Sequence, residues 1–191
     1  KYVLDNCPNE MEFFDKFVEK GLIEKLTKLI NSHFVRIDHK DVIKILKEAD
    51  VKWEFEPEYG EDIAKEHEKY ITEYFDGPVF IKNWPKDIKA FYMKLNDDNE
   101  TVAAVDLEVP GAGELMGGSQ REEKLDVLLK RMKELGMEEE GMEQYLDTFK
   151  HGMPPHGGLG IGLERLTMKL VGEDNVRETT LYPRDLSRLE P

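Results

Sequence analysis

The stretch VDLEVPGAGELMGGSQRE, residues 105–122, contains two runs of strand-forming residues on either side of a Pro-Gly-Ala-Gly turn. Proline and glycine are residues that form tight turns, so the stretch predicts a β-hairpin. Asp106 and Glu114 lie symmetrically about Pro110. Because side chains alternate between the two faces of a strand, we predict that these carboxylates lie on one face as cross-strand neighbours.

The segments around this hairpin predict an antiparallel sheet flanked by helices. Strand-type residues occupy 33–37, 77–84, 90–95, 101–109, 113–121 and the start of 154–172. Helical spacing occurs in 11–31 with an interruption at Gly21, in 38–50 with Asp38 as N-cap, in a segment ending near Phe75, in 122–136, in 139–150 and in the end of 154–172. Residues 176–184 are predicted to be extended. Because several strands follow one another without helices between them, the pattern favours an α+β fold over a doubly wound one.

The composition of the chain is that of one globular domain. Its 191 residues are 39% apolar and 36% charged, with a net charge of −14. This charge argues against a general clamp for nucleic-acid backbones, because such proteins are basic. Cys7 is the only cysteine, which excludes an internal disulfide. The cysteine content fits a cytoplasmic protein. No apolar run approaches the ~20 residues of a membrane span, so we expect no membrane partner.

Two carboxylates directly opposite one another on a hairpin repel each other. A divalent cation would relieve the repulsion, since Mg²⁺ binds one or two carboxylates and leaves its other positions to water and phosphate oxygens. The alternative is that Asp106 and Glu114 both face water, and the pattern alone favours this alternative, because acidic residues are abundant here.

Gly117 and Gly118 predict a bulge or a close approach of a ligand to the strand. By strict alternation Arg121 faces away from Glu114, but a bulge would bring it to the same side. There its guanidinium would suit a carboxylate or an amide oxygen. The alternative is an edge arginine in a surface ion pair.

A second glycine-rich segment, HGGLGIGLERL, occupies residues 156–166 and leads into a helix. Alternating glycines allow a flat ligand to lie against the backbone, and Arg165 in the first helical turn could reach a phosphate or stack on a base. The segment is neither a dinucleotide fingerprint nor a P-loop. The alternative is close packing of the helix on the sheet.

The sequence GLGIGLERL resembles motif 3 of the class II aminoacyl-tRNA synthetases, in the subgroup specific for aspartate, asparagine and lysine. The segment AFYMKLNDDNETVAAVDLEVPGAGELMGGSQRE is most similar to the asparaginyl-tRNA synthetases, and the resemblance extends over essentially the whole chain. It implies an antiparallel catalytic core and an ATP-dependent ligase for protein biosynthesis. Such enzymes activate asparagine with ATP and attach it to tRNA(Asn).

The resemblance also implies roles for individual residues. Asp106 and Glu114 match the acidic residues that hold Mg²⁺ and the ATP phosphates, and Arg121 matches the arginine that meets the substrate side chain. His156, just upstream of the glycines, is expected to line the amino-acid pocket. The motif 3 arginine corresponds to Arg165, which with Glu114 forms the expected catalytic pair. The expected ATP-binding residues are Glu114, Gly162, Leu163, Glu164 and Arg165.

Counterparts of motif 1, of motif 2 and of the N-terminal anticodon-binding barrel are not found in the sequence. Residues 1–191 are therefore expected to be the C-terminal portion of a catalytic domain, inactive by itself, from a homodimeric enzyme. The chain begins at Lys1 with the helix-like KYVLDN, which agrees with this expectation. The alternatives are an aspartyl-tRNA synthetase, a paralogue that makes free asparagine, and a non-enzymatic binding module with the same fold.

Overall fold

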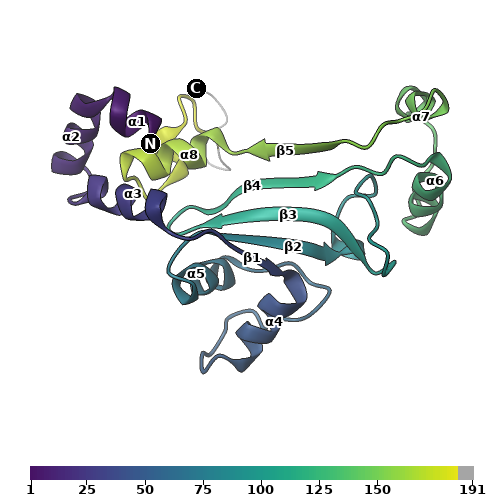
Figure 1. The fold of residues 1–191 in the computed structure, drawn as a ribbon, viewed down its shortest axis with the longest axis horizontal. Coiled ribbons are helices and arrows are strands. Elements are labelled where there is room, and N and C mark those ends of the chain that lie inside the picture. The colour runs from purple at the N-terminus through teal and green to yellow at the C-terminus, as the bar shows by residue number, and fades with distance from the viewer. Residues whose placement is uncertain (185–191) are drawn as a thin grey trace.

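The computed structural model describes residues 1–184, and in this range a five-stranded sheet forms the centre of the molecule (Figure 1). The strands, in their order across the sheet, are β1 (Val35–Asp38), β2 (Val79–Pro85), β3 (Thr101–Val109), β4 (Gly113–Gln120) and β5 (Gly157–Ile161). From β2 to β5 all neighbours are antiparallel, as predicted, whereas β1 runs parallel to β2. The parallel pair arises because two helices connect β1 to β2, which makes a crossover connection.

Helices surround the sheet at both ends and on one face (Figure 1). They are α1 (Tyr2–Asn6), α2 (Pro8–Phe17), α3 (Leu22–Asn31), α4 (His39–Glu48), α5 (Lys65–Tyr74), α6 (Leu125–Glu134), α7 (Glu143–Lys150) and α8 (Leu163–Val171). Helices α1 to α3 gather with α8 at one end of the sheet, and α6 and α7 lie at the other end. This arrangement confirms the predicted α+β fold. None of the helices within residues 1–184 is long and apolar enough to cross a membrane.

The main hydrophobic core lies between the sheet and helices α4 and α5. Its fully buried side chains come from both helices and from β2 and β3; they include Val42, Leu46, Ile71, Val79, Ile81, Trp84, Val102 and Ala104. Two smaller clusters hold α6 against α7 and α2 against α3. Burial of these side chains is the main term that fixes the two helices on the sheet. Helix α5 also contacts β3 and β4, which brings it to the hairpin of residues 105–122.

Two local predictions were confirmed. The break between α2 and α3 lies at Gly21, whose φ of +83° few other residues adopt. Asp38 occupies the N-cap of α4 but makes no capping hydrogen bond with its side chain. Its carboxylate instead binds Lys82 at 2.6 Å and the side-chain amide of Asn83 at 3.0 Å.

Two other local predictions were wrong. Residues 90–95 form isolated bridges at Met93 and Leu95 in place of a strand. The reason is that both edges of β3 are already occupied, one by β2 and the other, from Ala104 onward, by β4. Only the first residues of β3 therefore have a free edge with which residues 90–95 can pair. Residues 176–184 were predicted to be extended, but Val176–Thr179 is a 3₁₀ turn that the side chain of Asn175 caps.

Candidate functional site

The hairpin formed by β3 and β4 differs in register from the prediction. Asp106 pairs with Gly117, and the residue opposite Glu114 is Glu108. The turn is centred on Gly111 rather than Pro110, since Val109 pairs with Gly113. In addition, the register shifts between Leu107 and Glu108, which leaves one extra residue in β4 as a β-bulge. The predicted cross-strand pairing of Asp106 with Glu114 is therefore wrong.

The two carboxylates nevertheless converge on one point. A Cβ built on Gly117 would lie 2.8 Å from Oε1 of Glu114 and 3.2 Å from Oδ1 of Asp106. Both oxygens therefore flank the space that the absence of a side chain at Gly117 leaves open. The predicted bulge exists, but it lies before Gly117 rather than at Gly117 and Gly118. Gly118 has a different reason to be glycine, because a Cβ there would lie 2.9 Å from the Gly158 carbonyl oxygen of β5.

Asp106 has its two carboxylate oxygens in different surroundings. Oδ2 accepts a hydrogen bond from Nζ of Lys89 at 2.6 Å, while Oδ1 is directed toward Gly117. Burial raises the pKa of Asp106, and the Lys89 ammonium opposes this shift. Lys89 is itself held 3.8 Å from the centroid of the Trp84 ring, a cation–π contact. Asp106 is thus fixed at one oxygen, and its other oxygen faces the open space.

Glu108 is a further member of this acidic group that the sequence-based prediction did not include. It is 1% exposed, and its Oε2 has no hydrogen-bond partner among the described residues. Burial, followed by repulsion from Glu68, Glu114 and Asp106, raises the pKa of Glu108 to about 9. Strand alternation alone would have indicated it, since it lies two residues after Asp106 and therefore on the same face.

The fit of this group to a divalent cation depends on Asp106 and Glu114. Within residues 1–184, no cluster of three or more His, Cys, Asp or Glu side chains has metal-binding geometry. Two carboxylate oxygens do flank one open point, and a cation there would relieve the repulsion between them. This donor set fits Mg²⁺, which takes one or two carboxylates and completes its shell with water and phosphate oxygens.

Arg121 lies farther along the same face of the sheet. Its Nη1 donates a hydrogen bond to Oγ of Ser119 at 2.9 Å, and its guanidinium is 4.6 Å from the centroid of the Tyr92 ring. A Cβ on Gly158 would lie 2.9 Å from Nη2 of Arg121, so glycine in β5 leaves room for this side chain. The bulge at Leu115 shifts the alternation along β4, so Arg121 lies on the same face as Glu114 and Gly117, as predicted for a bulge between them.

His156 is adjacent to Arg121 through the backbone rather than through its ring. Its carbonyl oxygen accepts a hydrogen bond from the Arg121 N–H at 2.9 Å. The imidazole is exposed, and its Nδ1 lies 3.0 Å from the carbonyl oxygen of Pro154. The assignment of His156 to an amino-acid pocket stays a prediction.

Arg165 in the first turn of α8 connects this helix to the hairpin. Its Nη1 donates a hydrogen bond to the carbonyl oxygen of Glu114. The residues before it follow the predicted strand-to-helix transition: Gly162 is the N-cap of α8, and its N–H donates to the Leu115 carbonyl at 3.1 Å. Leu163 and Glu164 are exposed. The start of α8 is therefore held at the bulge beside Glu114.

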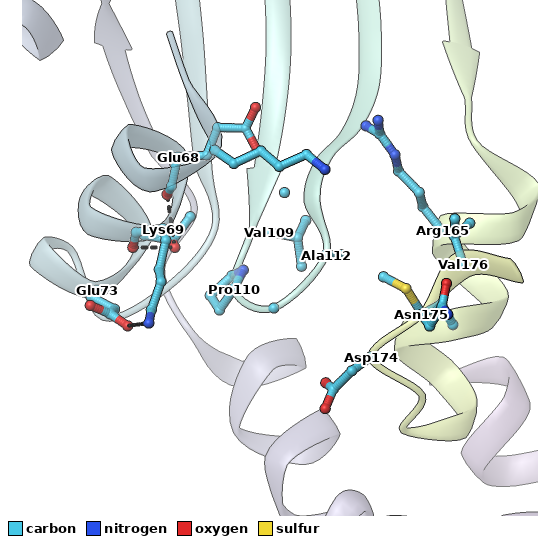
Figure 2. A pocket seen from close by; sticks show the side chains of 15 residues that line it. Glu68, Lys69, Glu73, Val109, Pro110, Ala112, Arg165, Asp174, Asn175 and Val176 are labelled. Atoms are coloured by element: carbon cyan, nitrogen blue, oxygen red, sulfur yellow. Dashed lines mark hydrogen bonds and ion pairs between the residues drawn. The ribbon is translucent and has the colours of Figure 1, made fainter. Parts of the chain in front are cut away.

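A cleft of about 570 Å³ lies between α5, the hairpin turn and α8 (Figure 2). Its lining includes Glu68 and Lys69 of α5, the turn from Val109 to Gly113, and Arg165. Asp106, Glu114 and Arg121 do not line the cleft itself, and Arg121 lies beyond the end of β4 that is farther from the turn. The acidic point over Gly117 thus lies near a cleft whose lining carries both basic and acidic side chains.

Comparisons with known proteins identify the family of this chain. The sequence profile of the family described as "tRNA synthetases class II (D, K and N)" matches residues 4–186. The asparagine–tRNA ligase of Acholeplasma laidlawii is 55% identical over 184 residues, which are 96% of this chain and 40% of that protein. The chain therefore spans about 40% of the length of the curated relatives it matches.

Solved structures show the same relationship. Asparaginyl-tRNA synthetase from Pyrococcus horikoshii, complexed with asparaginyl-adenylate, is 38% identical with a TM-score of 0.82, over 98% of this chain and 42% of that one. Aspartyl-tRNA synthetase from Entamoeba histolytica is 28% identical with a TM-score of 0.84, over 100% of this chain and 38% of that one. The chain belongs to the class II tRNA synthetases of the aspartyl, lysyl and asparaginyl group.

Proposed function

We propose that this chain forms the part of an asparagine–tRNA ligase that binds Mg²⁺-ATP and asparagine. The observation that carries the proposal is the convergence of Asp106 Oδ1 and Glu114 Oε1 over Gly117. It occurs on the sheet face that also holds Arg121, in a chain 55% identical to an asparagine–tRNA ligase. The similarity to a synthetase complexed with asparaginyl-adenylate supports the same assignment.

In the proposed reaction the carboxylate of asparagine attacks the α-phosphate of ATP and pyrophosphate leaves. The amino acid then passes from the adenylate to tRNA. Asp106 and Glu114 would hold Mg²⁺, which supplies neutralisation of the charge that develops on the phosphates. Arg165 is exposed and offers further N–H donors to phosphate oxygens. These residues act by positioning and by charge, so we expect no covalent intermediate on the protein.

The side chain of asparagine is assigned to Arg121. The contacts to Ser119 and to the Tyr92 ring hold the guanidinium in place, which leaves other N–H groups to donate to an amide oxygen. A preorganised donor discriminates against analogues that cannot accept its hydrogen bond. We keep His156 as a candidate for the same pocket because its backbone is bonded to that of Arg121.

Binding of a non-hydrolysable asparaginyl-adenylate mimic to the 191-residue chain tests the proposal. We expect calorimetry to show binding that requires Arg121 and that is tighter than binding of the aspartyl mimic. Tighter binding of the aspartyl mimic would favour an aspartyl-tRNA synthetase, which the solved Entamoeba structure keeps as the second candidate. Absence of binding to both mimics would contradict the proposal for this chain and favour a non-enzymatic module.

We further propose that the active enzyme charges tRNA(Asn), works as a homodimer and is cytoplasmic, where tRNA is used. The support is the identity with asparagine–tRNA ligases. Sedimentation of the enzyme and charging of purified tRNA(Asn) against tRNA(Asp) test the first two points. A monomer, or preferential charging of tRNA(Asp), would contradict them.

A further inference from the structure

Glu68 of α5 lies directly against the backbone of the hairpin that carries Glu114. Its Oε2 lies 2.5 Å from the position that a Cβ on Gly113 would take. Gly113 also has a φ of +68°, so both the close approach of Glu68 and the backbone conformation favour glycine here. The backbone N–H of the next residue, Glu114, lies close enough to the Glu68 carboxylate to oppose the rise in its pKa that burial causes.

Arg165 of α8 contacts the same residue from the other side. Its guanidinium donates to the carbonyl oxygen of Glu114, while the Glu68 carboxylate lies near the N–H of Glu114. Glu68 and Arg165 lie on opposite sides of the cleft in Figure 2, and they come from two different helices. The backbone of Glu114 thus has an anion near its N–H donor and a cation hydrogen-bonded to its carbonyl acceptor.

The position of Glu114 is one that needs such support. It lies beside the bulge at Leu115, where the regular ladder between β3 and β4 is interrupted. Its carboxylate also converges with that of Asp106 over Gly117, and like charges at close range repel. Without restraint from outside the hairpin, both effects would favour movement of Glu114 away from Gly117.

We propose that Glu68 is a positioning residue: together with Arg165 it fixes the backbone of Glu114 so that the Glu114 carboxylate stays directed at the space over Gly117. The functional role of this positioning rests on the proposed cation and ATP site. The restraint of the Glu114 backbone by Glu68 does not depend on that site. The competing explanation is that Glu68 only lines the cleft. Glu73 of the same helix separates the two explanations, because it lines the same cleft but pairs with Lys69, at 3.9 Å.

Amide hydrogen exchange of Glu114, measured by NMR on the 191-residue chain, tests the restraint. Glu68→Ala removes the acceptor, and Glu68→Asp keeps the charge but withdraws it by one methylene group. In both variants we expect exchange at Glu114 to be about tenfold faster or more, the loss expected for a hydrogen bond to a charged group. Glu68→Gln retains an acceptor oxygen without the charge, so its exchange rate should lie between those of the wild type and Glu68→Ala. The matched control Glu73→Ala should stay near the wild-type rate. Unchanged exchange in Glu68→Asp would overturn the proposal, even if Glu68→Ala fails to fold.

Titration with Mn²⁺, followed by electron paramagnetic resonance, tests whether the restraint of Glu114 supports cation binding. We expect Glu68→Ala and Glu68→Asp to bind Mn²⁺ severalfold more weakly, with affinity partly restored in Glu68→Gln. If Glu68→Gln weakens Mn²⁺ binding as much as Glu68→Ala, the charge of Glu68 acts and not its hydrogen bond, which would overturn the positioning role. Unaltered Mn²⁺ affinity in all three variants would also overturn it. If the wild-type chain binds no Mn²⁺, the proposed cation site fails, while the exchange rates still decide whether Glu68 restrains Glu114.

Discussion

Glu114 is a residue whose carboxylate the fold does not require. It lies opposite Glu108, whose pKa is raised by burial and then by repulsion from Glu68, Glu114 and Asp106. We predict that Glu114→Gln lowers the affinity for Mn²⁺ by about tenfold or more, because it removes a proposed ligand. The free energy of unfolding should change by less than about 1 kcal/mol, since no core packing is lost. Mn²⁺ titration measures the affinity, and urea denaturation measures the free energy of unfolding. An unchanged affinity would show that Glu114 is a solvated side chain and not a ligand.

His39 at the start of α4 predicts a dependence of stability on pH. It is fully buried, 4.5 Å from Trp84 between ring centroids, and burial lowers its pKa from 6.5 to about 4, with the Glu61 backbone opposing. Between these two pKa values the unfolded chain binds the proton and the folded chain does not. Stability is therefore complete above pH 6.5 and is lost as the pH falls toward 4, by up to about 3 kcal/mol.

His39→Phe tests this prediction because it removes the titrating group and keeps an aromatic ring. We expect the free energy of unfolding of the wild-type chain, from urea denaturation, to fall more steeply than that of the variant between pH 6.5 and 4. Carboxylates that titrate in this range affect both proteins equally. Equal slopes would contradict the prediction.

At the scale of elements, the β3–β4 hairpin shows what could be predicted from the sequence. Both strands and the turn followed from alternation and from the Pro-Gly signal, but the register did not. The extra residue at the bulge has no distinctive composition, because its position is decided by the pairing of β4 with β3 and β5. Glu68 was also beyond prediction, because its contact with Gly113 joins segments 45 residues apart through the packing of α5 on the core.

Strand β4 gives a prediction with a matched control on its neighbour. A Cβ at Gly117 would lie within 3.2 Å of both Asp106 and Glu114, whereas a Cβ at Gly160, its partner in β5, would meet no atom within 4 Å. We predict that Gly117→Ala weakens Mn²⁺ binding severalfold by displacing the two carboxylates, and that Gly160→Ala leaves it unaltered. Both variants should stay folded in thermal denaturation, since neither glycine has a positive φ. Equal affinity in the two variants would show that the space over Gly117 is not the binding point.

For the whole molecule, the antiparallel sheet with flanking helices followed from the order of strands and helices along the chain. The parallel pairing of β1 with β2 did not, because the chain between them returns through α4 and α5, and the side of the sheet on which it returns depends on tertiary packing. The same packing explains the site. The core between α5 and the sheet brings Glu68 to the hairpin from one side, and the docking of α8 brings Arg165 from the other.

The net charge of −14 leads to a prediction for the molecule as a whole. Self-repulsion destabilises a compact state, and salt screens it, so NaCl should raise the melting temperature gradually. MgCl₂ at equal ionic strength should raise it further if Asp106 and Glu114 bind the cation, because a ligand that binds only the folded state adds stability. Differential scanning calorimetry measures both effects. The additional effect of Mg²⁺ should disappear in a chain carrying Asp106→Asn and Glu114→Gln while the effect of NaCl persists, and an additional effect that persists in this variant would place the cation elsewhere.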